Sequence, residues 1–246
     1  TTTIIDADSI AKLIGNAADV KTVLAATTGI NLGTAKDIDV SGTISAADAN
    51  AIAKATDGAL TATINSGSVA ATLKALADVD KAIDKITFTT TDKTVNARDL
   101  VKLNGKIKNS ANFDVTSIET ITENAKDVGL NAKNVTDALG IAANADVKIS
   151  GNISADNAAT IAAAAGTGTL TATIFPGTAQ NLEAALNGVT GALTLTLTDE
   201  TVVAGDLDAL TAVTTVAINA NSVKTITADA ADVTDVSAVL AIISLT

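Results

Sequence analysis

The sequence contains no cysteine, histidine, methionine, tryptophan or tyrosine, and only three phenylalanines and one proline occur in its 246 residues. These absences exclude thiol and imidazole nucleophiles or bases, disulfide bonds, zinc and haem sites built from Cys or His, and a Ser-His-Asp triad. Carboxylates, lysines, hydroxyls and amides remain, and their spacing indicates no particular reaction. The sequence therefore predicts a protein that is not an enzyme and carries no cofactor.

Basic residues are also scarce, with 16 Lys and Arg against 27 Asp and Glu and a net charge of -11. Binding to a phosphate backbone needs clustered Lys and Arg, so we expect no nucleic-acid partner. No stretch reaches the roughly 18 uninterrupted apolar residues typical of a membrane span, so we expect no membrane insertion. Hydrophobic residues nevertheless make up 47% of the chain, which predicts a continuous core rather than disorder.

The chain repeats itself with a period of roughly 100 residues. Ser41–Ile64 matches Ser150–Ile174, and Ser117–Val128 matches Ser222–Val233. A partial repeat opens the chain, where Asp19–Leu24 resembles the end of each later repeat. We therefore predict a single elongated domain over residues 1–246, with long repeats at 1–37 (partial), 38–146 and 147–246.

Within each long repeat, strand-like and helix-like runs alternate about every 20 to 30 residues. The strand-like runs alternate apolar residues with threonine, as in Leu60–Ile64, and this period of two with β-branched residues predicts strands. The runs between them place apolar residues at helical spacing, for example at Val69, Leu73 and Leu76. Hydroxyl residues that suit helix N-caps precede the helical runs at Ser45, Ser68, Ser154 and Thr178. Glycines that suit left-handed helix ends follow at Gly58, Gly168 and Gly188.

One strand with its short helix cannot bury its own apolar face, so successive units must stack on one another. The sequence therefore predicts the α/β class, and within it a right-handed repeat solenoid of parallel β-strands stacked with short α-helices.

Two resemblances extend this prediction. Residues 210–226 ("LTAVTTVAINANSVKTI") resemble a leucine-rich repeat, with Asn221 at the place of that family's buried asparagine, which implies a curved parallel β/α stack. The Ala-, Thr- and Asp-rich composition resembles the repeat regions of large secreted bacterial surface proteins, such as those of cyanobacteria. That resemblance implies a location outside the cell or on its surface, and a structural, adhesive or surface-layer role.

Closely spaced acidic residues are candidate calcium ligands, because calcium prefers carboxylate oxygens. The candidates are Asp78, Asp80, Asp206 and Asp208. Neither a calcium-binding nonapeptide ladder nor an EF-hand loop accompanies them, so the pattern favours solvated turns and helix starts over a metal site.

The threonines of the strand runs predict an exposed face that could bind ice or a polysaccharide, or that simply suits a solvated strand. These residues are Thr61, Thr63, Thr87, Thr89, Thr171, Thr173, Thr194 and Thr196. Apolar strands at both chain ends predict edges for assembly. They comprise Thr3, Ile4, Ile5, Ile242, Ile243 and Leu245.

The prediction for function is a non-catalytic extracellular structural protein, a rigid rod that forms a filament or surface layer. Unpaired strand edges would be satisfied by head-to-tail self-association or by neighbouring repeats of a longer chain. The alternative is a binding module, an adhesin or ice-binding protein, that uses the Thr-rich strand face.

Overall fold

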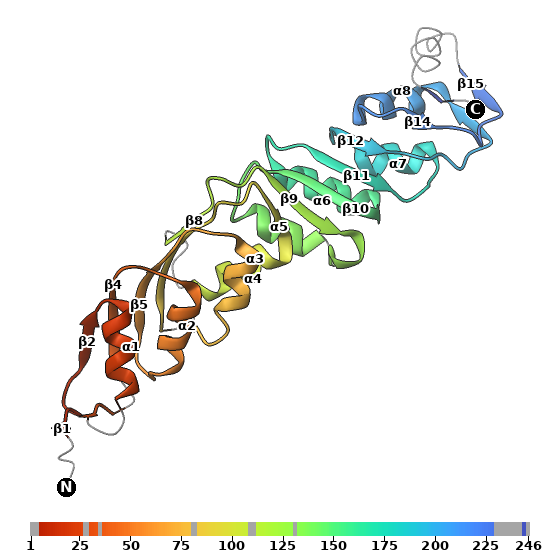
Figure 1. The fold of residues 1–246 in the computed structure, drawn as a ribbon. Coiled ribbons are helices and arrows are strands. Elements are labelled where there is room, and N and C mark those ends of the chain that lie inside the picture. Colours follow the sequence, from red (N-terminus) through yellow and green to blue (C-terminus); the bar gives the residue numbers. More distant parts are fainter. Residues whose placement is uncertain are drawn as a thin grey trace. The chain divides into compact units, whose positions relative to one another are not determined.

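The computed structural model describes residues 5–26, 30–33, 36–79, 83–107, 112–129, 132–228 and 243–244 (Figure 1). Residues 1–95 and 99–118 form one compact unit, unit 1, and residues 96–98 and 119–246 form unit 2. Both units consist of parallel strands that alternate with short helices, so the predicted α/β class is confirmed.

Unit 1 is built on a five-stranded parallel sheet in the order β2-β4-β5-β6-β8. Its strands are β2 (Lys12–Gly15), β4 (Asp37–Ile44), β5 (Leu60–Ile64), β6 (Lys85–Thr89) and β8 (Phe113–Asp114). A separate parallel pair joins β1 (Ile5–Asp6) to β3 (Ile30–Asn31). The helices are α1 (Ala17–Ala25), α2 (Ala46–Lys54), α3 (Val69–Ala75) and, from Asp99 onward, α4 (Ala97–Lys106).

Unit 2 contains a second five-stranded sheet in the order β12-β11-β10-β9-β7, of which β7 (Thr94–Asn96) contributes its last residue to this unit. The other strands are β9 (Thr120–Asn124), β10 (Asp146–Ile153), β11 (Leu170–Ile174) and β12 (Gly191–Thr194). Two parallel pairs join β13 (Thr201–Val203) to β15 (Thr225–Thr227) and β14 (Ile218–Asn219) to β16 (Ile243–Ser244). The helices are the 3-10 turn η2 (Ala125–Asp127), α5 (Lys133–Leu139), α6 (Ala155–Ala165), α7 (Ala179–Leu186) and α8 (Ala204–Val213).

The order of the strands in each sheet follows the order of the chain. In unit 1, β4 pairs with β5 and β5 with β6, and a helix lies between each two strands in sequence. In unit 2 the same rule joins β9, β10, β11 and β12. We call a strand with the helix that follows it a coil. Within each five-stranded sheet, neighbouring coils are hydrogen-bonded to one another in the order of the chain.

The matching segments Ser41–Ile64 and Ser150–Ile174 share an unusual backbone feature. The pairing of β4 with β5 shifts register between Asp39 and Thr43, and the pairing of β10 with β11 shifts between Lys148 and Asn152. Each shift contains a glycine with positive φ, Gly42 at 75° and Gly151 at 87°. The sequence repeat thus has a structural counterpart in a bulge at the same place.

Alternate strand residues form the core, as the period of two predicts. In β5 the side chains of Leu60, Ala62 and Ile64 are buried, and Thr61 and Thr63 between them are exposed. Phe88 and Phe113 are buried with their ring centroids 5.8 Å apart. Phe175, the third phenylalanine, is 56% exposed. The resemblance to a leucine-rich repeat is wrong about Asn221, because this residue is exposed and not buried.

Capping chemistry confirms the predicted helix starts. The side chains of Ser45, Ser68, Ser154 and Thr178 each accept a hydrogen bond from the backbone N–H three residues later. Of the predicted left-handed glycines, Gly188 has a positive φ of 78°, whereas Gly58 and Gly168 do not. A Cβ on Gly168 would lie 2.3 Å from the carbonyl oxygen of Ala145, so this glycine allows close approach to a neighbouring coil instead.

Candidate functional site

A buried carboxylate distinguishes strand β9 from the strands beside it. Ile121 and Glu123 of β9 are both buried, and the side chain of Glu123 is 1% exposed. In the pairing of β9 with β10, Glu123 lies opposite the buried Ile149. An acidic group in an otherwise apolar layer needs partners, because an unpaired buried charge is very costly.

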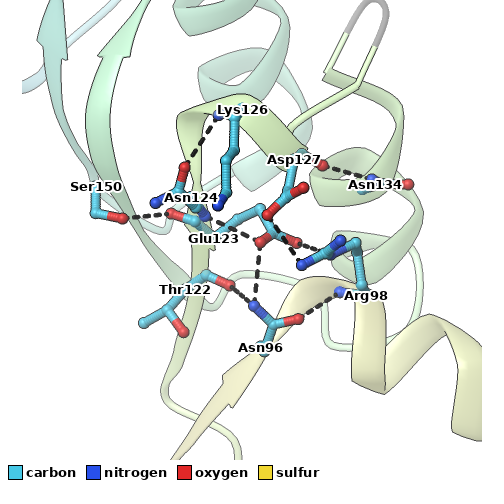
Figure 2. Close-up of polar contacts among 9 residues, drawn as sticks. All are labelled: Asn96, Arg98, Thr122, Glu123, Asn124, Lys126, Asp127, Asn134 and Ser150. Atoms are coloured by element: carbon cyan, nitrogen blue, oxygen red, sulfur yellow. Dashed lines mark hydrogen bonds and ion pairs between the residues drawn. The ribbon is translucent and has the colours of Figure 1, made fainter.

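Three groups contact the Glu123 carboxylate (Figure 2). Its Oε1 accepts hydrogen bonds from Asn96 Nδ2 at 3.1 Å and from the backbone N–H of Asn124 at 2.9 Å. Its Oε2 lies 3.4 Å from Arg98 Nε, an ion pair without hydrogen-bond geometry. Arg98 Nη2 also donates to Asp127 Oδ2 at 3.0 Å, so one guanidinium neutralises two carboxylates. We call Asn96, Arg98, Glu123 and Asp127 the Glu123 cluster.

A groove of about 510 Å³ lies over this cluster, with Thr122, Lys148, Ser150 and Thr171 among its other lining residues. Both acids of the cluster are bound by Arg98, and the remaining polar lining groups are hydroxyls, amides and one lysine. Each carboxylate of the cluster is thus held by the same guanidinium. These hydrogen bonds and ion pairs, which we call the clasp, hold Asn96 and Arg98 against β9 and η2.

The following long repeat shows that this clasp is not required by the fold. The sequence "DKTVNARDL" (residues 92–100) matches "DETVVAGDL" (residues 199–207), so Val203 and Gly205 stand where the first has Asn96 and Arg98. Ala228 likewise stands at the place of Glu123. Because β13 pairs with β15 as β7 does with β9, the same coil pairing forms with small or apolar residues at all three positions.

A second set of acidic side chains joins neighbouring coils through the backbone. The carboxylate of Asp146 accepts from both the backbone N–H and the hydroxyl of Thr169, each at 2.8 Å. Similar bonds to backbone N–H groups are made by Asp37 to Ala59 (2.9 Å), Asp84 to Leu60 (2.8 Å), Asp92 to Val69 (2.7 Å) and Asp199 to Ala179 (2.8 Å). Five aspartates of this acidic chain therefore join neighbouring coils.

Asp146 makes stability dependent on pH. The two hydrogen bonds from Thr169 hold the pKa of Asp146 below its ordinary value, because they stabilise the charged form. A carboxylate whose pKa is lowered by folding contributes stability that is present above its unfolded pKa of about 3.9 and lost as pH falls through the folded pKa. We expect Asp146→Asn to be less stable than the unchanged chain at pH 7, and this difference to shrink as the pH is lowered below about 4.

Urea unfolding at several pH values, followed by circular dichroism, measures that difference. Asp57→Asn is the control, because Asp57 is an exposed acid in a bend. If Asp146→Asn loses the same stability at pH 3 as at pH 7, Asp146 does not act through its charge.

Of the predicted calcium ligands, Asp78, Asp206 and Asp208 lie within the described residues. Asp78 is exposed, and its carboxylate accepts a hydrogen bond from Asn50 Nδ2 at 2.9 Å. Asp206 and Asp208 lie two residues apart on α8, so they point in different directions around the helix. Asp80 lies outside the described residues. Within the described ranges, no group of three or more acidic side chains could hold a metal ion.

The predicted threonine face is present in part. Thr61, Thr63, Thr87, Thr89 and Thr194 are exposed, whereas Thr171, Thr173 and Thr196 are half-buried. In the strand register Thr43, Thr63 and Thr87 form a row of three, but Thr61 lies between Asp39 and Lys85. Asp39 also forms an ion pair with Lys12 at 2.5 Å, so charged groups divide this face.

Of the residues predicted to form assembly edges, the structure describes Ile5 and Ile243, and both lie in strands. Ile5 in β1 pairs with Ile30, and Ile243 in β16 pairs with Ile218. Thr3, Ile4, Ile242 and Leu245 lie outside the described residues.

Sequence reasoning missed Glu123 and the backbone-binding aspartates, although the position of Glu123 two residues after Ile121 placed it on the inward face of its strand.

Among the described helices, none combines the length and the apolar character required to cross a bilayer. A scan against protein-family models found no match to this chain, and searches of curated proteins and of solved structures found none either.

Proposed function

We propose that this chain is a non-catalytic structural protein of the extracellular space or cell surface. In this proposal its coils form a repeat solenoid, a rigid rod that builds a filament or surface layer. Rods meet end to end, or continue into neighbouring repeats of a longer polypeptide. The proposal includes no nucleic-acid partner, no membrane insertion and no cofactor. Ca²⁺ is the one candidate ion, so the experiment below is carried out with and without it.

The observation that carries the proposal is the pairing of successive coils. In the described residues the strand pairs of the unit 1 sheet are parallel, as are those that join β9, β10, β11 and β12, and each of these pairs joins one coil to the next. In such an array each coil is stabilised by its neighbours, so the array can be extended without changing its internal contacts. The clasp around Glu123 and the backbone-binding aspartates serve the same purpose, since they connect residues about 20 to 30 positions apart and hold coils together.

Assembly is the test of this function. We expect the chain to form linear particles as its concentration rises, because strand edges at the ends of a stack favour head-to-tail contact. Sedimentation and negative-stain electron microscopy, each with and without Ca²⁺, measure this directly. Dispersed monomers at every concentration, in both conditions, would contradict the proposal.

A second function, a binding module, is favoured by the exposed row Thr43, Thr63 and Thr87. Such a row places hydroxyl and methyl groups about 4.8 Å apart on neighbouring strands, a regular array that could face ice or a polysaccharide. Thermal hysteresis and a glycan pull-down distinguish the two functions, because a purely structural rod gives no signal in either assay.

A further inference from the structure

Three short segments of the chain correspond to one another in sequence: segment I (residues 5–20), segment II (113–128) and segment III (218–228). Each begins with a two-residue strand, β1, β8 or β14. The last side chain of that strand then accepts a hydrogen bond from the backbone N–H two residues later, in the pairs Asp6 with Asp8 (3.1 Å), Asp114 with Thr116 (3.0 Å) and Asn219 with Asn221 (3.2 Å). Each segment continues into a longer strand, β2, β9 or β15.

The three longer strands differ in what pairs with them. β9 pairs with β7, and β15 pairs with β13. β7 and β13 are themselves corresponding strands, with the sequences "TVN" and "TVV". β2 pairs with β4 and is an edge strand of its sheet, so within the described residues it has no strand in the place that β7 and β13 occupy.

Exposed apolar side chains mark this open edge and its counterpart. Ile14 of β2 is 69% exposed, and Val203 of β13 is 47% exposed. Thr122 in segment II and Thr227 in segment III hold the position of Ile14. Val203 lies opposite Thr227 in the pairing of β13 with β15, so the cross-strand neighbour of this exposed valine is a threonine and not an apolar residue.

We propose that β2 of one molecule pairs in parallel with β13 of a second molecule of this chain, in the place that β15 holds in the isolated molecule. The inference rests on the proposed function, since it names the contact by which molecules join end to end. With the register of β15 retained, Ile14 lies opposite Val203 and Leu13 lies opposite the buried Val202. Two exposed apolar side chains become cross-strand neighbours, and the open edge of β2 is filled.

The exchange concerns β15 alone, and not β14, whose Ile218 is buried and pairs with Ile243. In β15, Ile226 is half-buried and Thr225 and Thr227 are exposed. Lys224 Nζ and Glu200 Oε1 form an ion pair at 2.7 Å, with both side chains at least 70% exposed, and such surface pairs contribute little to stability. The backbone bonds of β15 are replaced by those of β2, whose strand has the same alternation. The contact joins two different surfaces, so it can repeat from molecule to molecule and produce an open filament.

Cysteine cross-linking tests this contact, because the chain has no cysteine of its own. Ile14→Cys and Val203→Cys are prepared separately and mixed in equal amounts under mild oxidation. Directly opposed residues on paired strands fall within the narrow Cα separation that a disulfide requires, so we expect at least about tenfold more covalent dimer than in the control mixture. The control mixture is Ile14→Cys with Phe175→Cys, since Phe175 is similarly exposed at 56% but lies outside β13.

Sedimentation of the unchanged chain separates failure of this contact from failure of the function. Cross-linking confined to the Ile14→Cys and Val203→Cys mixture supports the proposal. If the unchanged chain assembles but both mixtures cross-link equally or not at all, the contact is wrong and the structural function stands. If the unchanged chain stays monomeric at all concentrations and no cross-link forms, both fail.

Discussion

Replacing Gly168 by alanine is expected to lower the free energy of unfolding by about 3 kcal/mol, because the new methyl group meets backbone that cannot move aside. A Cβ at this position would lie 2.3 Å from the carbonyl oxygen of Ala145, 2.8 Å from its carbonyl carbon and 2.9 Å from the carbonyl oxygen of Asn144. All three atoms belong to the preceding coil. The corresponding Gly58 is equally close to Lys36, with its Cβ 2.3 Å from the carbonyl oxygen, so the same cost applies there.

Gly205→Ala is the matched control. A Cβ on Gly205 meets no atom within 4 Å, and the residue lies in helix α8, where alanine is preferred to glycine by about 0.5 to 1 kcal/mol. Urea unfolding followed by circular dichroism should show Gly168→Ala destabilised and Gly205→Ala unchanged or stabilised. Equal stability of the two variants would mean that close contact between coils does not require Gly168.

Arg98→Gly is expected to lower the free energy of unfolding by about 2 to 3 kcal/mol, because it leaves the buried Glu123 carboxylate without its counter-charge. We place the loss below the largest values known for buried pairs, since the Arg98 side chain is 42% exposed. The triple variant Asn96→Val, Arg98→Gly, Glu123→Ala reproduces the residues of the following repeat and removes the charge along with its partners. We expect its stability to lie within about 1 kcal/mol of the unchanged chain.

Arg98→Gly and the triple variant both have a glycine at position 98, so the destabilisation that glycine causes in a helix cancels when the two are compared. Urea unfolding of the single variants Asn96→Val, Arg98→Gly and Glu123→Ala, and of the triple variant, gives the interaction energy within the Glu123 cluster. If the triple variant loses as much free energy of unfolding as its single changes lose in sum, the prediction is wrong. This coil would then need the Glu123 cluster and could not use the valine, glycine and alanine of the following repeat.

The parts of the fold that depend on near neighbours in sequence could be predicted. The alternation of Leu60–Ile64 identified a strand, and Ser45, Ser68, Ser154 and Thr178 identified helix starts, because side-chain alternation and N-capping act within a few residues. The repeated motifs also placed corresponding segments in corresponding structures, down to the register shifts of β4 and β10.

The features that depend on the next coil could not be predicted in this way. Gly58 and Gly168 follow helices, where a left-handed conformation is the usual reason for glycine, but the carbonyl groups that require them belong to a different coil. The bonds from Asp37 and Asp146 reach backbone groups that local pattern does not identify. Asn96 and Arg98 could not be assigned to Glu123 because the register of the coils was unknown.

The pairing of each strand with strands close to it in the chain has a consequence for how the chain folds. All the described strand pairs connect residues separated by roughly 20 to 30 positions, so the chain never has to close a long loop before contacts form, and its contact order is low for a protein rich in β-structure. A growing or translocating polypeptide could add one turn of structure at a time to those already folded, and newly made hydrophobic segments would not have to wait for the far end of the chain.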